Sequence, residues 1–479
     1  MLRPPPERQR RTGLRRAGGR RRRAPGGRRT QFGRLGERPA HRTTELYAAS
    51  LSAGPARSAL PKWPKSDGKR RKMKLGMERK SRPGPLVPGS QQSRDRRAFY
   101  GFAVCGLSGA TWLFAPWTGW FAPVLSLLVL LIAAPAQRCW RSRAICALGY
   151  MLPATCSIVT SYAVFFRGAS VLSGVVVWLV VAALLALPWA MAKGPWSTLA
   201  AAVLSGALGP ISIWPLAGLL FPSAGLGGLF LLVLLVFCAG EIGALVVRGR
   251  PAFVTANLYP FFLAGFLYSN VVALVHGAPK TPAGWVAVNT FGLRQTGPDV
   301  FAGLRNTQRV IDAGRGHGDA RVLVFPEAAL NDMLPGTVAM VSHAVPPGQI
   351  WLVGAEDGKH DAIWQFESDR KPRLATDSAL PMPGSMWRPW DPAVSYVPAW
   401  RQSTFHVGRL RVWSSICYEQ VVPWSWVEAL LARPGIVLLQ SNAWWAGPGN
   451  PAPAIQRAQA SAWVRLMGVT SLAVSNETL

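Results

Sequence analysis

The chain has 479 residues, 49% of them hydrophobic, and its 53 basic and 22 acidic residues give a formal net charge of +31. A chain of this length can hold two or more domains. The averages hide three unlike sections: residues 1–97 hold 29 of the basic and 6 of the acidic residues, residues 98–276 are nearly uncharged and apolar, and residues 284–479 are mixed. This organisation excludes a single soluble globular domain.

Residues 1–97 form a basic tail rich in Arg, Pro and Gly. Such a segment buries too little apolar surface to offset the entropy lost on folding, so we expect it to be disordered. Unspecific binding to nucleic acid or anionic lipid is one interpretation of its charge, and we expect no specific nucleic-acid binding. The other interpretation is an over-extended start, with translation beginning at Met73 or Met77.

Seven apolar segments follow the tail, each near or above the roughly 20 residues that cross a bilayer as a helix. They cover residues 98–115, 119–136, 144–166, 170–192, 196–221, 225–247 and 252–275. The loops on one side carry six Lys and Arg residues, and those on the other side carry only Arg167. Because basic loops remain cytoplasmic, we predict a multi-pass protein of a bacterial inner membrane with residues 284–479 in the periplasm.

Residues 284–479 alternate predicted strands with predicted helices, as in an α/β domain. The expected strands are 285–289, 321–325, 350–355, a hairpin over 405–416 that turns at Gly408, 436–440 and 470–475, and the expected helices are 298–314, 424–431 and 452–467. Reactive or polar residues follow three of these strands, namely Glu327, Cys417 and the pair Ser441 and Asn442. Since such sheets gather functional groups at the carboxyl ends of strands, these residues could meet in one cleft.

Cys417 and Glu327 are the candidate nucleophile and base. Cys417 is the only cysteine after residue 238, so its own domain offers no disulfide partner. A thiol beside a carboxylate from another strand end can act as an activated nucleophile; the alternative is a buried structural cysteine and a helix-capping glutamate. The six cysteines include no CxxC pair and no metal-ligand spacing, so we predict neither a metal nor a cofactor.

Three sequence blocks resemble the signature blocks of the carbon–nitrogen hydrolase (nitrilase) superfamily: Phe-Pro-Glu327-Ala-Ala, Ile-Cys417-Tyr418-Glu419 and Gln440-Ser-Asn442-Ala-Trp444. A polytopic membrane half ahead of such a domain is similar to the apolipoprotein N-acyltransferases. Residues 380–390 look closer still to the conjugal-transfer TraB proteins. The resemblance covers residues 98–476 and implies a seven-span helical membrane domain followed by a nitrilase-like αββα sandwich.

The resemblance also implies roles for individual residues. Cys417 would attack an acyl carbonyl to form a thioester, Glu327 would act as the base, a lysine would stabilise the oxyanion, and Tyr418, Glu419 and Asn442 would position the nucleophile. Asp377 stands where the family has its lysine and would oppose an oxyanion, so Lys371 is the nearest candidate for that role. The chain reaches Leu479 where the family continues, so we expect the domain to be truncated at its carboxyl end.

Two functions are compatible with these observations. One is a thiol-dependent acyltransferase or amidase at the periplasmic face, using a membrane lipid or lipoprotein-like acyl donor and acceptor, with lipoprotein acylation as its fullest form. The other is a TraB-like component of the conjugation machinery, in which the fold is a catalytically degenerate scaffold. A transporter is a weaker third interpretation, because the apolar segments lack paired charges.

Overall fold

The computed structural model describes residues 89–166, 169–207, 209–248, 253–293, 300–330 and 332–477. These residues belong to one of the two units into which the chain divides, residues 83–479. The tail predicted over residues 1–97 lies outside the described residues except for its end. Residues 89–97, which were assigned to that tail, form the beginning of the first helix.

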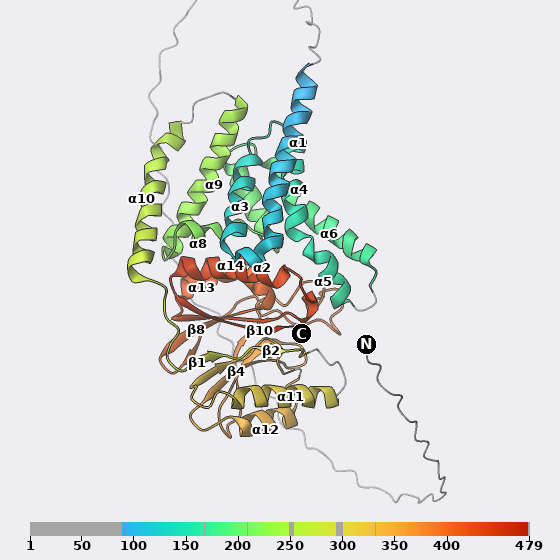
Figure 1. Ribbon diagram of the computed structural model, residues 1–479, viewed down its shortest axis with the longest axis vertical. Coiled ribbons are helices and arrows are strands. Elements are labelled where there is room, and N and C mark those ends of the chain that lie inside the picture. The colour runs from blue at the N-terminus through green and yellow to red at the C-terminus, as the bar shows by residue number, and fades with distance from the viewer. Residues whose placement is uncertain are drawn as a thin grey trace, which may run out of the picture. The chain divides into compact units, whose positions relative to one another are not determined.

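Apolar helices make up the first part of this unit (Figure 1). They are α1 (Gly89–Ala110), η1 (Thr111–Phe114), α2 (Ala115–Thr118), α3 (Phe121–Ala133), α4 (Trp140–Thr155), α5 (Ser157–Phe165), α6 (Val171–Ala186), η2 (Leu187–Met191), α7 (Pro195–Gly206), α8 (Leu216–Leu220), α9 (Gly225–Arg248) and α10 (Phe253–His276). Among the described residues, three helical stretches are long and apolar enough to cross a membrane, Asp95–Thr118, Val171–Met191 and Gly225–Val247. A fourth is present if α4 and α5, which meet at 47°, count as one span.

The prediction of seven spans is not supported by these helices. Helix α3 has 13 residues, and the apolar stretch Pro260–His276 of α10 is also shorter than a span. The segment predicted as one span over residues 196–221 is interrupted, because α7 ends at Gly206 and α8 starts only at Leu216. Pro210 and Pro215 lie in or next to this interruption, and proline cannot continue a helix without losing a hydrogen bond. The apolar helices are consistent with membrane association, and the side on which residues 284–479 lie stays a prediction.

Two five-stranded sheets form the second part of the unit. In the first sheet the order is β1 (Trp285–Ala287), β3 (Val322–Val324), β4 (Ile350–Glu356), β5 (Asp361–Phe366) and β6 (Arg373–Asp377). In the second it is β2 (Thr290–Phe291), β10 (Thr470–Glu477), β9 (Ile436–Asn442), β8 (Leu410–Ile416) and β7 (Phe405–Val407). Neighbouring strands are parallel except where β5, β6 and β7 pair antiparallel.

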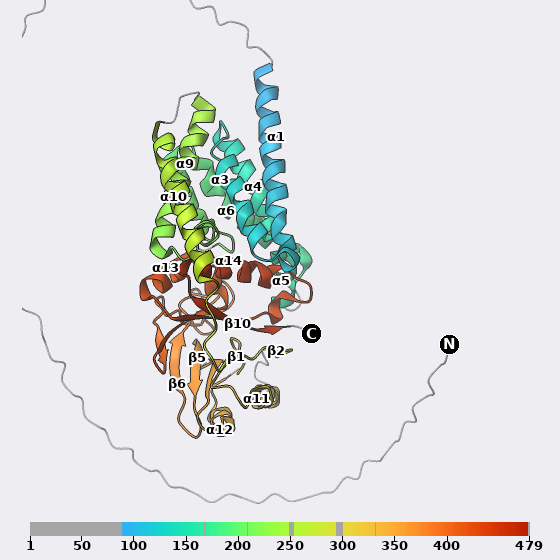
Figure 2. The same ribbon diagram turned by 60° about the vertical axis from the view of Figure 1, so that its left-hand side comes forward.

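The two sheets pack face to face, and helices cover both outer surfaces (Figures 1 and 2). Inward-facing β-branched and leucine side chains of both sheets form the central core, among them Val324, Leu352, Val412 and Leu438. Helices α11 (Val300–Arg315) and α12 (Pro335–Ala344) cover the first sheet, and α13 (Pro423–Ala432) and α14 (Ala452–Met467) cover the second. The expected mixture of strands and helices is therefore confirmed, whereas assignment to the nitrilase fold stays a prediction.

Helix α14 joins the sandwich to the apolar helices. At Gly218 of α8, an added Cβ would lie 1.6 Å from the backbone oxygen of Ala462 in α14, so the two backbones touch. Gln459 of α14 donates its side-chain amide to Pro210 O and accepts the N–H of Ser212 at 3.4 Å. These bonds satisfy backbone groups that the interruption between α7 and α8 leaves without helical partners.

Candidate functional site

Cys417 and Glu327 lie beyond the carboxyl ends of strands in opposite sheets. Glu327 follows β3 by three residues, and Cys417 directly follows β8 at the start of η3 (Cys417–Val421). The backbone is left-handed at Cys417 (φ 41°) and at Ala328 (φ 47°), which is uncommon for residues other than glycine. Strained positions of this kind occur mainly at functional sites and at sharp turns that present a nucleophile.

The side chains of these two residues are in contact. The Cys417 thiol hydrogen-bonds to the Glu327 carboxyl, and the Asn442 N–H donates to Glu327 Oε2 at 2.9 Å. Gln456 of α14 donates its amide to the Cys417 carbonyl at 2.8 Å, which helps to fix the strained turn. The structure thus brings together three residues that the sequence singles out, Glu327, Cys417 and Asn442.

Burial decides the protonation of this pair. It raises the pKa of Glu327 to about 7, against the opposing effect of hydrogen bonds from Cys417, Asp361 and Asn442. Burial and, next, the charge of Glu327 hold the pKa of the Cys417 thiol well above its ordinary value. Near neutral pH the sulfur therefore carries its proton, while Glu327 has the proton affinity that suits a general base.

Tyr418 and Glu419 directly follow Cys417 in η3, and their predicted role in positioning the nucleophile stays a prediction. Glu419 is fully buried and accepts the Ile416 N–H at 3.0 Å, the Ser378 hydroxyl at 2.8 Å and the Gln402 amide at 2.9 Å. It also accepts the N–H of Ala379, so it ties the turn at Cys417 to the segment after β6. Tyr418 lines a cavity beside Cys417, and burial raises the pKa of its hydroxyl to about 12.

Lys371 is not brought to this site. It lies in the connection between β5 and β6, where Arg373 pairs with Gln365. The site is at the opposite end of these strands, and the five residues of β6 alone span about 13 Å. The Lys371 side chain is exposed. The expectation that Lys371 completes the site is therefore corrected: the antiparallel β5–β6 pair carries it to the far end of the sheet.

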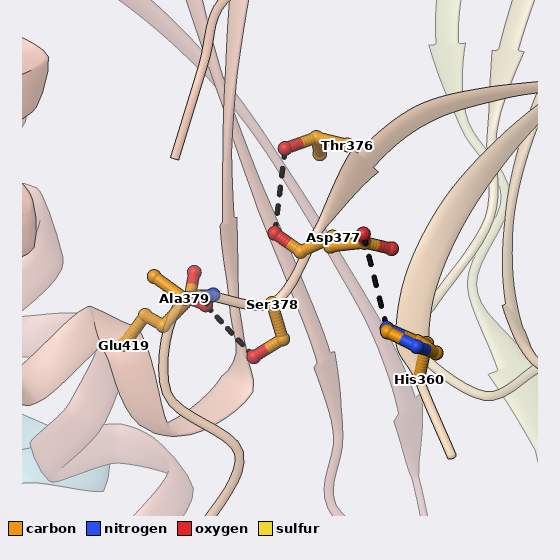
Figure 3. Close-up of polar contacts among 6 residues, drawn as sticks. All are labelled: His360, Thr376, Asp377, Ser378, Ala379 and Glu419. Carbon is orange, nitrogen blue, oxygen red and sulfur yellow. Dashed lines mark hydrogen bonds and ion pairs between the residues drawn. The ribbon is translucent and has the colours of Figure 1, made fainter. Parts of the chain in front are cut away.

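Asp377 turns away from the nucleophile. It pairs with Ala362, and its Oδ2 lies 3.9 Å from Nδ1 of His360. Figure 3 shows Asp377 directed towards His360, whereas the next residue, Ser378, is directed towards Glu419. Successive side chains of a strand point to opposite faces, so Asp377 and Ser378 are on different sides of the sheet. This corrects the expectation that Asp377 opposes an oxyanion at Cys417.

The site contains acidic residues that sequence reasoning missed. Glu356 ends β4 and Asp361 begins β5, and both side chains are buried. The Asp361 carboxyl hydrogen-bonds to Glu327, and the hydroxyl of Tyr396 donates to Glu356. The dipeptide Asp357-Gly358 between the two strands is a hairpin signal that could have revealed β5. Within the described ranges, no group of three or more His, Cys, Asp or Glu side chains is arranged to hold a metal ion.

A cavity of about 620 Å³ opens beside Cys417. Apolar side chains of the helices α5 and α6 line one part of it, among them Ile158, Phe165, Val181 and Leu184. Residues 382–385 and Ile455 line the part next to the sandwich. Cys417 therefore borders a space shared by the α/β domain and the apolar helices.

Comparison with known proteins places the chain beside conjugation proteins. A probable conjugal transfer protein TraB from Sinorhizobium fredii is 28% identical over 379 residues, which cover 73% of this chain and 92% of the relative. The chain is thus similar to TraB proteins. A conjugal transfer protein TraB from Agrobacterium fabrum is 28% identical over 289 residues, 56% of this chain and 64% of that protein. No protein-family model matches the chain, and the resemblance to carbon–nitrogen hydrolases and apolipoprotein N-acyltransferases stays a prediction.

Proposed function

We propose that this chain is a TraB-like membrane protein of a conjugation system and that its α/β domain is a nitrilase-like acyl-transfer domain. In this proposal Cys417 accepts an acyl group from a lipid-like donor, and an amine or water then removes it. The names of the two relatives support the conjugation part. The contact between the Cys417 thiol and the Glu327 carboxyl supports the chemical part.

The cavity beside Cys417 is the observation that carries the acyl-transfer proposal. A small polar amide would need no apolar space of this kind, whereas a fatty acyl chain would fill it with its carbonyl at the sulfur. Each methylene that leaves water contributes about 0.8 kcal/mol. About four methylenes that reach side chains such as Ile158 and Val181 would then favour a long chain over a short one by about 3 kcal/mol, or roughly 200-fold in rate.

In this proposal the reaction has two steps, acylation of Cys417 and removal of the acyl group. Glu327 takes the proton of the Cys417 thiol as the sulfur attacks the acyl carbonyl, and the departing alcohol or amine leaves with that proton. The thioester then reacts with an amine or water, whose proton Glu327 accepts and returns to the sulfur. Asn442 holds Glu327 in line through its backbone N–H, and Glu419 holds the turn that carries the sulfur.

A scaffold without catalysis is the second candidate, and one observation favours it. Among the described residues, no Lys or Arg side chain hydrogen-bonds to Glu327 or Cys417. An oxyanion hole donor contributes roughly 3–4 kcal/mol to reactions of this class. Without such a donor, and with a thiol that stays protonated, acylation would be slow.

The two candidates differ in whether Cys417 becomes acylated. Full-length protein in lipid nanodiscs is mixed with the p-nitrophenyl esters of acetate and palmitate, and released p-nitrophenolate and acylated peptides are measured. We expect one acyl group on Cys417, faster with palmitate, and none on that peptide in Cys417→Ala. The matched control is Cys139→Ala, which removes an exposed thiol in the helical part of the chain, distant in sequence from Cys417. No acyl group at Cys417, or equal rates with the two esters, would contradict the proposal.

A further inference from the structure

Asp361 makes direct contact with the proposed base. Strand β5 begins at Asp361, whose side chain points between the sheets like that of Ile363 two residues later. Its carboxyl hydrogen-bonds to that of Glu327 and is almost fully buried, 2% exposed. Its Oδ1 atom has no hydrogen-bond partner among the residues that the structure describes. An ionised carboxylate would lose much hydration in this position, whereas a neutral acid would lose far less.

The contact between the two carboxyl groups requires a proton. An ionised carboxylate only accepts hydrogen bonds, so one member of the pair must be protonated. Glu327 already accepts the N–H of Asn442 and shares a hydrogen bond with the thiol of Cys417. A carboxylate at Glu327 satisfies all three contacts as acceptor. Asp361 is therefore the member that donates.

The acidic groups around Asp361 also favour its protonated form. Burial first, then the negative charges of Glu327, Glu356 and Glu419, raises the pKa of Asp361 well above its ordinary value. Tyr396 lies on this side and donates its hydroxyl to Glu356. His360 and Asp377 face each other on the opposite surface of the sheet (Figure 3).

We propose that Asp361 is a positioning residue that stays a neutral acid and donates its proton in a hydrogen bond to Glu327. The bond stabilises the ionised form of Glu327 and directs it at the Cys417 thiol. During acylation Glu327 takes the proton from sulfur, and Asp361 keeps its own. This inference rests on the proposed function, because it assigns Asp361 a part in activating the same thiol.

Two substitutions separate a donated proton from a structural contact. Asparagine can donate an amide N–H from nearly the same place, whereas alanine cannot. In full-length protein in nanodiscs, we expect Asp361→Ala to acylate Cys417 about tenfold or more slowly at pH 7. Its rate should rise with pH about one unit later than in the wild type, because Glu327 without the donor holds a proton more tightly. Asp361→Asn should stay within about twofold of the wild type, with the same pH profile.

A matched control and an infrared measurement complete the test. Asp377→Ala removes an acid from the neighbouring strand that faces away from Glu327, so we expect it to leave the rate and pH profile unchanged. The carbonyl band of a protonated carboxylic acid at pH 7 should be weaker in Asp361→Asn than in the wild type.

The possible failures can be told apart. If Asp361→Asn loses acylation as Asp361→Ala does, or if its infrared spectrum keeps the whole band, Asp361 is not a neutral donor and the inference is overturned. If Asp361→Ala acylates like the wild type, the contact has no positioning role and the inference is again overturned. If the wild type forms no acyl group on Cys417 and releases p-nitrophenolate no faster than Cys417→Ala, the proposed function is wrong. The positioning role of Asp361 is then wrong as well.

Discussion

The ionised Glu327 side chain should lower the free energy of unfolding at neutral pH, and the substitution Glu327→Gln should restore it. Burial raises the pKa of Glu327 from 4.5 to about 7. The folded state therefore binds more protons than the unfolded state between these values, and the free energy of unfolding falls as the pH rises through this window. A difference of about 2.5 pKa units corresponds to about 3 kcal/mol at pH 8. Below pH 4.5, where both states are protonated, the cost is absent.

The assay is thermal unfolding of the full-length protein in detergent at pH 5 and pH 8. We expect Glu327→Gln to unfold roughly 5–10 °C higher than the wild type at pH 8 and at nearly the same temperature at pH 5. Asp391→Asn, which removes an exposed acid, is the matched control and should shift neither value. A glutamine variant that is less stable than the wild type at pH 8, or whose gain is equal at both pH values, would refute the assigned protonation.

Three further predictions concern the rate, the packing and the topology. The acylation rate of Cys417 should rise about tenfold per pH unit below pH 7 and level off above it, because Glu327 acts as a base only when ionised; a rate independent of pH between 5 and 8 would contradict this role. Gly218→Leu should destabilise the contact between α8 and α14 by about 1–3 kcal/mol in thermal unfolding, because its Cβ has no room beside Ala462, whereas Gly227→Leu, whose Cβ would meet nothing within 4 Å, should be tolerated. Alkaline phosphatase fused after residue 284 should be active if the α/β domain is periplasmic, and an inactive fusion would reverse the predicted orientation.

Among the parallel strands, β1, β3, β4 and β9 are largely continuous apolar runs and were predicted, whereas the two-residue strand β2 was missed. The runs that end before Glu327, Cys417 and Asn442 became β3, β8 and β9. The ends of β8 and β9 meet because these strands are parallel neighbours, and the end of β3 lies beside them because its sheet packs face to face against theirs. The antiparallel strands β5 and β6 were missed. Asp361, Gln365, Arg373 and Asp377 interrupt their apolar pattern.

The predictions for Lys371 and for the number of spans failed for a related reason. Closeness in sequence suggested that Lys371 could fold back to the site, but the β5–β6 pair reverses the chain direction and separates residue 371 from residue 377 by the length of a strand. Hydropathy counts apolar residues and does not register where the backbone turns. The segment around Pro210 therefore resembled a span although its helix is interrupted.

The joint at α14 has a consequence for biosynthesis. Gln459 bonds to the backbone at Ser212, which was synthesised 247 residues earlier. At bacterial rates of roughly 5–20 residues per second, the ribosome needs about 10–50 s to cover that distance. Throughout this interval α14 is not yet available. Gly218 therefore lacks its contact with Ala462, and the Pro210 carbonyl and the Ser212 N–H lack their hydrogen bonds to Gln459. The packing of the apolar helices is therefore incomplete until α14 docks, and a chain arrested before that point should be a substrate for chaperones or proteases.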